Sequence, residues 1–480
     1  MPGLSTVSYP SALSSTMGSR GQTGGDVLDV VHDAIALGVD VELGDLLLFV
    51  ALKVTAPAGG LGGRDLRLAE PTNVHKQQRS RLRIVAILGG RVMSYIGRHW
   101  YDRMTPRDTS EPHRAATNLE LLFDLVFVVA IAGAASSLEV AIAEGRYSWG
   151  VVHFVMVFFA VWWAWMNFTW FASAYDVDDG PYRLLTLVEM GGALIIASGV
   201  SAAFNDQDYT IVVAGYVLMR LAMIVQWLRA AAGDPTRRPT ALRYAIGIGV
   251  AQAGWVGLLL IPSQWSIPVY FALMAVELTV PIWAEHATAT PWHPGHIAER
   301  YGLFTIIVLG ESIGAAVLSM REAADEGGED VDLYGIAGFG LIIVFCMWWV
   351  YFDRDAATLL RGRTSALGWG YGHLVIFGSA AAVGAGLQVA ITAATHHDHI
   401  PHQVVGASIA IPVIGFLAGV WTLHIVSLGS RWLNTVYAVT IVAVALTVPL
   451  PATLALVAIC LAGLVAVSAW AGHRFAEAPR

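Results

Sequence analysis

Five ionisable residues stand inside long apolar stretches of the sequence, where a charge is costly: Asp124, Glu189, Arg220, Glu277 and Glu311. A single charge at the centre of a bilayer costs about 2.5 to 3.5 kcal/mol even on the lenient insertion scale. We therefore expect these side chains to face one another or water rather than lipid. Arg220 cannot shed its proton and needs a carboxylate partner, for which Asp124 and Glu311 are the candidates.

Glu311 is flanked by Gly310 and Gly314 in the run GLFTIIVLGESIGAAVL. Small residues four apart let another helix approach closely, so the two glycines predict a close-packed helix seam bordered by Glu311 and Ser312. Ser312 is thus expected to join the five charged residues in an intramembrane polar network or ion path. The alternative is a network that only fixes helix packing, because buried pairing can be purely architectural.

Other side chains carry weaker chemical signals. His293, His296 and Glu299 have a spacing that could bind a metal, but Pro294 after His293 favours a helix start. A histidine-rich loop could capture zinc or copper, although incidental loop chemistry is the preferred interpretation; its histidines are His396, His397, His399 and His402. Four tryptophans are predicted to form an interfacial belt, with a cation-binding aromatic cage as the alternative; they are Trp162, Trp163, Trp165 and Trp170.

The composition defines the class of protein that must position these groups. The chain has 480 residues, of which 56% are hydrophobic and 13% charged, so a polytopic membrane protein is expected. Cys346 and Cys460 lie in apolar segments and predict neither a disulfide framework nor a cysteine metal site. We find no phosphate-binding loop, dinucleotide fingerprint or hydrolase motif, and we predict no cofactor.

Apolar segments long enough for a bilayer recur along the chain after residue 103. They predict about twelve helices, at 117–142, 150–173, 184–204, 211–228, 244–261, 265–284, 301–320, 334–352, 370–394, 403–427, 433–448 and 452–471. With this count, one side of the membrane receives nearly all arginines of the connecting segments, and the other side receives only Arg146 and Arg321. The positive-inside rule then places both termini in the cytoplasm.

The sequence before the first span has a different character. Residues 1–103 contain both lysines of the chain, Lys53 and Lys76, and mix Gly/Ser/Pro-rich text with short apolar runs. One of them, DLLLFVALKV, is too short to span a bilayer. We expect a poorly structured extension, or a segment that precedes a true translation start at Met93 or Met104.

Two halves of the membrane region resemble each other. A shift of 181 residues aligns LFDLVFVVAIAGAAS (122–136) with LFTIIVLGESIGAAV (303–317), and VWWAW (161–165) meets MWWVY (347–351) with a slightly longer loop. We therefore predict an all-α polytopic transmembrane helix bundle of about 12 spans, built as a 6+6 parallel internal repeat. Chance similarity between helices rich in Ala, Gly and Val is the alternative.

Four stretches carry a resemblance to a known family: NLELLFDLVFVVAI (118–131), AVWWAWMNFTWFASAYDVDDGPYRLL (160–185), YVLMRL (216–221) and HIAERYGLFTIIVLGESI (296–313). They resemble the bacterial low temperature requirement protein A (LtrA) family from about residue 113 onward, so 104–480 is expected to be an LtrA-like multi-pass membrane domain. Leu122 stands where the family's first-helix motif is usually aromatic. Eleven residues fall on motif positions by this resemblance: Glu120, Asp124, Asp178, Asp179, Arg183, Arg220, His296, Glu299, Arg300, Glu311 and Ser312. The family is named for a growth phenotype and implies no substrate.

We predict a bacterial inner-membrane transporter or channel for a small solute or ion, in which Asp124 and Glu311 bind a cation or proton and Arg220 tunes their charge. Its expected partners are the lipid bilayer and that solute or ion, and it could form a homo-oligomer. We expect no binding of nucleic acid. An intramembrane enzyme for a lipid or isoprenoid substrate is the alternative, with His296, Glu299 and Glu311 as acid/base groups. A membrane sensor or assembly factor without flux is the third hypothesis.

Overall fold

The computed structural model divides the chain into two units, Met1–Trp100 and Tyr101–Arg480. The residues that the structure describes are 100–109, 111, 114–325, 330–360, 363–395 and 400–476. Nearly all of the predicted extension at 1–103 lies outside them, as do His396, His397 and His399. The description that follows therefore concerns the second unit.

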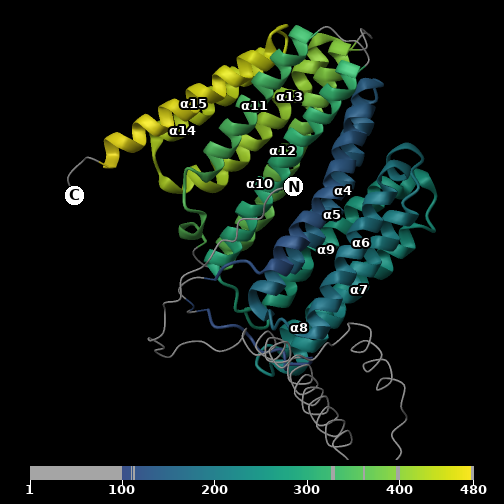
Figure 1. Ribbon diagram of the computed structural model, residues 1–480. Helices are drawn as coiled ribbons and strands as arrows, with labels where there is room; N and C mark the ends of the chain where they lie inside the picture. Colours follow the sequence, from purple (N-terminus) through teal and green to yellow (C-terminus); the bar gives the residue numbers. More distant parts are fainter. Residues whose placement is uncertain are drawn as a thin grey trace, which may run out of the picture. The chain divides into compact units, whose positions relative to one another are not determined.

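The described residues form an all-α bundle without strands (Figure 1). Its α-helices are α4 (Asn118–Ala143), α5 (Tyr147–Tyr175), α6 (Gly180–Asn205), α7 (Thr210–Gly233), α8 (Arg238–Leu258), α9 (Ser263–Glu285), α10 (Pro294–Asp325), α11 (Asp330–Phe352), α12 (Arg363–Thr395), α13 (His402–Val420), α14 (Arg431–Thr447) and α15 (Thr453–Ala476). Each apolar segment predicted from the sequence coincides with one of these helices.

Ten helices of the described residues are long and apolar enough to cross a membrane, and α8 and the 17-residue α14 are not among them. The protein is therefore an all-helical, multi-pass membrane protein, as its composition predicted. The number of about 12 spans stays a prediction.

Local sequence sets several helix ends near the charged residues. Thr117 and Glu120 form a reciprocal capping box at the start of α4, in which each side chain accepts the other's backbone N–H. Asp179 caps α6 by accepting from the Tyr182 N–H. The preceding Asp178 has a left-handed backbone with φ of 48°, which aspartate tolerates better than most residues. These caps fix where the two helices begin.

The two groups of six helices share most of their pairs of neighbours, although α11 packs closely against α15 and α5 has no such close packing with α9. In the first, α6 packs against α4 and α7, α7 against α8, and α8 against α9. In the second, α12 packs against α10 and α13, α13 against α14, and α14 against α15. The groups meet where α4 and α5 contact α10 and α12 (Figure 1). A six-plus-six repeat would produce this shared order, and the repeat itself stays a prediction.

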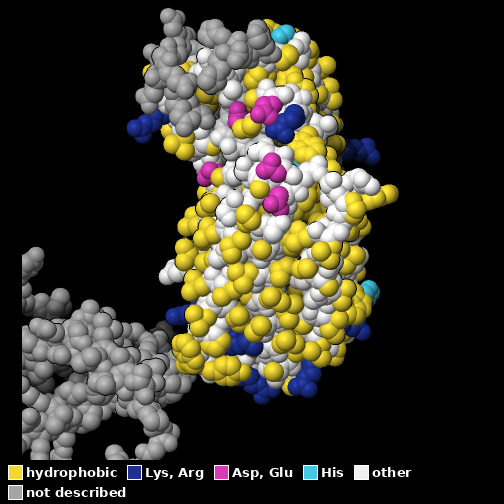
Figure 2. Space-filling model, turned by 90° about the vertical axis from the view of Figure 1, so that its right-hand side faces the viewer, with side chains coloured by type: hydrophobic (Ala, Val, Ile, Leu, Met, Phe, Trp, Pro, Cys, Tyr) yellow, Lys and Arg dark blue, Asp and Glu magenta, His cyan; other side chains and the backbone are white. Residues whose placement is uncertain are grey.

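The outer surface suits a lipid environment. Large apolar side chains such as Ile246, Val250 and Ile411 are more than half exposed. Figure 2 shows a broad apolar band along one face; basic side chains lie at its lower end and also in the upper half, where the acidic side chains in view are found. Lipid readily accommodates exposed apolar side chains. The charged side chains buried among the helices are costly there and need a separate explanation.

Candidate functional site

Arg300 joins the two groups of helices through two carboxylates of α4. Its Nη2 lies 2.6 Å from Asp124 Oδ1 and its Nε donates to Oδ2 at 3.1 Å, which is a bidentate pair. Its Nη1 lies 3.0 Å from Glu120 Oε1. All three side chains are at most 1% exposed. Glu120 and Asp124 are four residues apart on one helix face, and this spacing lets both reach the single guanidinium of α10.

A tryptophan and a histidine extend this junction network. Trp165 of α5 donates its indole N–H to Asp124 Oδ1 at 2.7 Å. His296 of α10 places Nε2 3.1 Å from Glu120 Oε1. The network therefore ties α4, α5 and α10 together with partners of matching charge and geometry.

A third acid extends the junction network beyond the ends of the helices. Asp176, just after α5, lies 3.4 Å from Arg114 and 3.5 Å from Arg107. Burial is the main reason that the pKa of Asp176 is raised to about 6, with Glu120 adding to the shift and the two arginines opposing it. Burial likewise lowers the pKa of Arg114. Around the junction, each of the three buried carboxylates thus has an arginine within 4.0 Å, and the partly exposed Arg107 also pairs with Glu111.

Glu277 is the centre of a second network, inside the first group of helices. Its side chain is fully buried and accepts hydrogen bonds from five donors on three helices, α5, α7 and α8. The donors are Trp163 Nε1 (3.0 Å), Tyr216 Oη (3.0 Å), Arg220 Nη2 (3.0 Å), Gln252 Nε2 (3.2 Å) and Trp255 Nε1 (3.1 Å). A carboxylate offers about four lone-pair sites, so this one is saturated by the protein.

Glu189 faces the same arginine across a very tight helix seam. A Cβ on Gly192 of α6 would stand 2.3 Å from Met219 Cγ, and one on Gly215 of α7 would stand 2.6 Å from the Gly192 oxygen. Because α6 and α7 run antiparallel, this register sets Glu189 opposite the turn that contains Arg220. Arg220 is indeed its charged neighbour.

Several polar atoms of this second network have no hydrogen-bond partner in the described part of the chain. They are Glu189 Oε1, Arg220 Nε, Arg220 Nη1 and Gln252 Oε1. Glu189 is 2% and Arg220 1% exposed. Two carboxylates share one guanidinium here, so the fully ionised group carries one uncompensated negative charge. Such a group normally takes up a proton, a cation or ordered water.

The structure corrects the predicted partners of the buried charges. Arg220 pairs with Glu277 rather than with Asp124 or Glu311, and Asp124 pairs with Arg300. The physical reason is helix placement, because α7 and α9 belong to the same group whereas Asp124 lies on the junction face of α4. Glu120 and Asp124 share one face of α4 and have Arg300 as their common partner.

The predicted glycine seam around Glu311 is wrong. A Cβ on Gly310 or Gly314 would meet open space, and Glu311 itself is half-buried. The close approach lies instead on the Ser312 face of α10, where a Cβ on Gly384 would stand 2.9 Å from Ser312 Oγ. Glu311 is eleven residues from Arg300, about 16 Å along the helix, so it belongs to neither network.

The remaining motif residues have structural roles or stand apart. Asp179 also accepts from Arg229 at 2.5 Å, whereas Asp178 and Arg183 pair on the surface. Glu299 is half-buried and takes no part in the junction network. His293 precedes α10 and its Nδ1 accepts from the His296 N–H at 3.2 Å, which confirms the predicted helix start.

The predicted tryptophan belt is also wrong for three of its four members. Trp162, Trp163 and Trp165 are fully buried, and two of them donate to the acids Glu277 and Asp124. Sequence reasoning missed the other donors of Glu277, whose signal is the presence of polar-tipped side chains within apolar segments; they are Tyr216, Gln252 and Trp255.

Metal binding receives no support from the residues described. They contain no group of three or more His, Cys, Asp or Glu side chains that could hold an ion. Of the histidine-rich loop only His402 is described, and its Nε2 lies 3.2 Å from the Pro449 oxygen. Cys346 and Cys460 are free thiols.

Fold and networks together define a class: an all-α, multi-pass integral membrane protein with two buried ion-pair networks among its helices. The sequence model of the bacterial low temperature requirement A protein (LtrA) family matches residues 115–469. The chain belongs to this family. It is also 27% identical, over 395 residues, to an uncharacterized protein of Rhizobium meliloti (strain 1021), covering 78% of this chain and 91% of that relative.

Proposed function

We propose that the protein transports a small cation or proton across the bacterial cytoplasmic membrane, with both termini on the cytoplasmic side. The observation that carries this proposal is the charge imbalance among Glu189, Glu277 and Arg220. Buried charges that are matched by equal numbers of opposite charges can have a purely structural role in helix packing. A buried group with one acid in excess needs a positive charge from outside to neutralise it. A cation transporter requires such a binding site for a cation or proton within the membrane.

Arg220 can compete with that cation or proton for the Glu277 carboxylate. Its Nη2 holds Glu277, while its Nε and Nη1 have no partner in the described residues and Glu189 lies across the seam. A cation or proton that neutralises Glu277 frees the guanidinium to pair with Glu189, and its departure restores the observed pair. Two arrangements of one arginine between two acids form the kind of bistable element that alternating access requires.

The junction network then has a different role. Its ion pairs join α4 and α10, the first helices of the two groups, and hold the groups in register. Asp124, Glu120 and Arg300 are therefore structural in this proposal, whereas Asp124 was expected to bind the cation.

The orientation rests on the distribution of arginine. The connections on the side of the α10 start contain Arg237, Arg238 and Arg243, and those on the opposite side contain few arginines. The enzyme hypothesis is less consistent with the geometry. Its three acid/base groups lie on one helix, and Glu299 and Glu311 are about 18 Å apart along its axis.

The test is ion flux in proteoliposomes that contain the purified protein. Proton and monovalent-cation fluxes are compared for the wild type, Glu189→Gln and a control variant, Glu144→Gln, whose surface carboxylate is 54% exposed. Glu189→Gln keeps the side-chain volume and removes an oxygen that has no described partner, so the fold should persist. We expect flux to fall at least about tenfold in Glu189→Gln and to stay unchanged in the control, because the loss of one charge contact costs more than 1.4 kcal/mol.

The opposite result is equally informative. Intact wild-type protein that passes no ion under any applied gradient would overturn transport and favour the sensor or assembly hypothesis. Undiminished flux in a folded Glu189→Gln variant would remove Glu189 from the path. Glu311→Gln, tested beside them, should retain flux because Glu311 lies outside both networks.

A further inference from the structure

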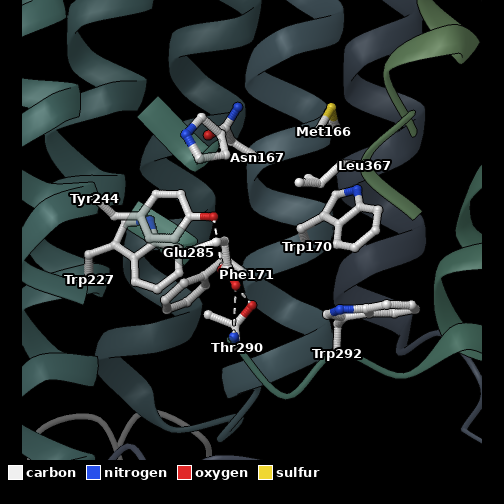
Figure 3. A pocket seen from close by; sticks show the side chains of 11 residues that line it. Met166, Asn167, Trp170, Phe171, Trp227, Tyr244, Glu285, Thr290, Trp292 and Leu367 are labelled. Carbon is white, nitrogen blue, oxygen red and sulfur yellow. Dashed lines mark hydrogen bonds between the residues drawn. The ribbon is translucent and has the colours of Figure 1, made fainter. Parts of the chain in front are cut away.

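A small pocket lies on the side of the first helix group where α9 ends and α10 begins. Residues from α5, α7, α8 and α9 line it, together with Thr290, Trp292 and Leu367. Figure 3 shows Trp227 and Tyr244 on one side and Trp170 and Trp292 on the other. Its cavity volume is about 30 Å³. About 10 to 15 Å³ of such space is enough for one water molecule, so the pocket has room for one or two particles of that size.

The walls of this pocket are aromatic and held in place. The rings of Trp227 and Tyr244 stack at 4.0 Å between centroids, and those of Trp170 and Trp292 meet at 5.2 Å with an angle of 60°. Trp170 is fixed further by its indole N–H, which donates to the Tyr301 hydroxyl at 3.0 Å. Aromatic faces carry negative electrostatic potential and attract cations, more strongly where water is excluded.

An acid stands between the aromatic walls. Glu285 is 5% exposed, and its Oε1 accepts from the Tyr244 hydroxyl at 3.1 Å and from Thr290 Oγ1 at 2.8 Å. Its Oε2 accepts from the Thr290 N–H at 3.0 Å. Figure 3 shows this group at one edge of the pocket and Asn167 at the opposite edge. Carboxylate, hydroxyl and amide oxygens around π faces form a set of groups that suits a cation and disfavours an anion.

The pocket continues the face that carries the second network. On α9, Glu277, Pro281 and Glu285 are spaced four residues apart and share one side of the helix. On α8, Tyr244 and Gln252 are eight residues apart, as Glu277 and Glu285 are on α9. Eight residues correspond to about 12 Å of helix, so the two acids lie roughly 12 Å apart along one bundle.

The helix backbone is also altered between the two acids. Pro281 lines the pocket, and its ring nitrogen cannot donate to the Glu277 carbonyl one turn earlier. That carbonyl oxygen is therefore released from the helical hydrogen-bond pattern between the two carboxylates. Oxygen atoms freed in this way are cation ligands in other interrupted membrane helices.

We propose that the pocket between Trp170, Trp292, Tyr244 and Glu285 is a binding site for one small, weakly hydrated monovalent cation of the ammonium or potassium class. It is the cytoplasmic-side station from which the cation proceeds to Glu277, and in this respect it rests on the proposed transport function. The volume excludes larger organic cations. Strongly hydrated sodium is disfavoured, because aromatic faces cannot replace its water shell.

Binding is measured separately from flux, on the purified full-length protein in detergent. Thermal unfolding is followed during titration with ammonium chloride, potassium chloride, sodium chloride and choline chloride at constant ionic strength. We expect saturable stabilisation by ammonium or potassium and none by sodium or choline, because only a ligand that prefers the folded protein raises its unfolding temperature. Comparing ammonium with potassium identifies which of the two the site prefers.

Two variants locate the binding event. Glu285→Gln should weaken the apparent affinity at least about 30-fold, because it removes the only charge among the lining residues named for the pocket. Trp292 lies in a connection rather than a helix. Trp292→Leu should weaken the apparent affinity roughly 2- to 30-fold, because one aromatic face is lost. Glu144→Gln, on the surface, should titrate like the wild type. Trp292→Leu keeps the test decisive if Glu285→Gln fails to fold.

The outcomes separate this inference from the transport proposal. Equal stabilisation by all four salts, or unchanged affinity in folded Glu285→Gln and Trp292→Leu variants, overturns the cation site whatever the flux. Cation-specific binding that both variants weaken supports the site even if the liposomes show no flux, and only the role as a station on a path is then lost.

Discussion

The bidentate pair of Arg300 and Asp124 should be one of the strongest polar couplings in the protein. Both side chains are 0% exposed, and the two N–O distances are 2.6 and 3.1 Å. Arg300→Met leaves two buried carboxylates without their cation, and removal of one partner from a buried pair typically costs about 3 to 5 kcal/mol. Asp124→Asn should cost about 1.5 to 3 kcal/mol, because Arg300 keeps Glu120.

The two costs should not add. Once Asp124 is neutral, the loss of Arg300 strands one carboxylate instead of two, and Glu120 retains His296 at 3.1 Å. We therefore expect a coupling energy of about 2 kcal/mol or more in the double-mutant cycle. The assay is equilibrium unfolding in mixed micelles, with the free energy of unfolding measured for the wild type, both single variants and the double variant.

The chain provides a matched control with the same chemistry at the surface. Arg183 and Asp178 also form a bidentate pair, with both N–O distances 2.7 Å, but their side chains are 59% and 53% exposed. Asparagine at 178 tolerates the left-handed backbone, so the control isolates the charge. Its coupling should be about 0 to 1 kcal/mol. A coupling for Arg300 and Asp124 no larger than that of the surface pair would refute the junction network.

Two further predictions concern stability. The pKa of Asp176 is raised to about 6 by burial, above its unfolded value near 3.8, so the free energy of unfolding should fall by about 2 kcal/mol as the pH rises from about 4 to 6. Thermal unfolding at several pH values should show this fall in the wild type and not in Asp176→Asn; parallel profiles would contradict it. Gly384→Ala should destabilise by about 1 to 3 kcal/mol, because its Cβ would press on Ser312, whereas Gly314→Ala should be almost neutral. Equal unfolding temperatures for the two glycine variants would place the helix seam elsewhere.

The helices themselves were predictable from the sequence. In a bilayer every backbone polar group must be satisfied within its own segment, so a long apolar run becomes a helix almost regardless of its neighbours. The segments predicted at 117–142 and 211–228, for example, became α4 (Asn118–Ala143) and α7 (Thr210–Gly233). Family membership also followed from sequence motifs around Glu120 and Glu311.

The sequence also identified most members of the two networks, because charged residues in apolar segments are conspicuous. It could not identify their partners. Which carboxylate meets Arg220 depends on which helices adjoin and on the rotation of each about its axis, and both are set by side-chain packing such as the fit of Gly192 against Met219. Glu311 shows the limit of prediction from sequence. Its flanking glycines match a helix-packing motif, but no other helix among the described residues packs against them.

The sequence by itself thus determined that this is an all-α, multi-pass membrane protein with acids and arginines inside its helices. Only the tertiary structure decided that Arg300 pairs with both Glu120 and Asp124 whereas Arg220 pairs with Glu277, and that an aromatic pocket with Glu285 lies along the helix from Glu277. The physical reason is that hydropathy is a property of each segment, whereas charge balance and cavities are properties of several helices packed together.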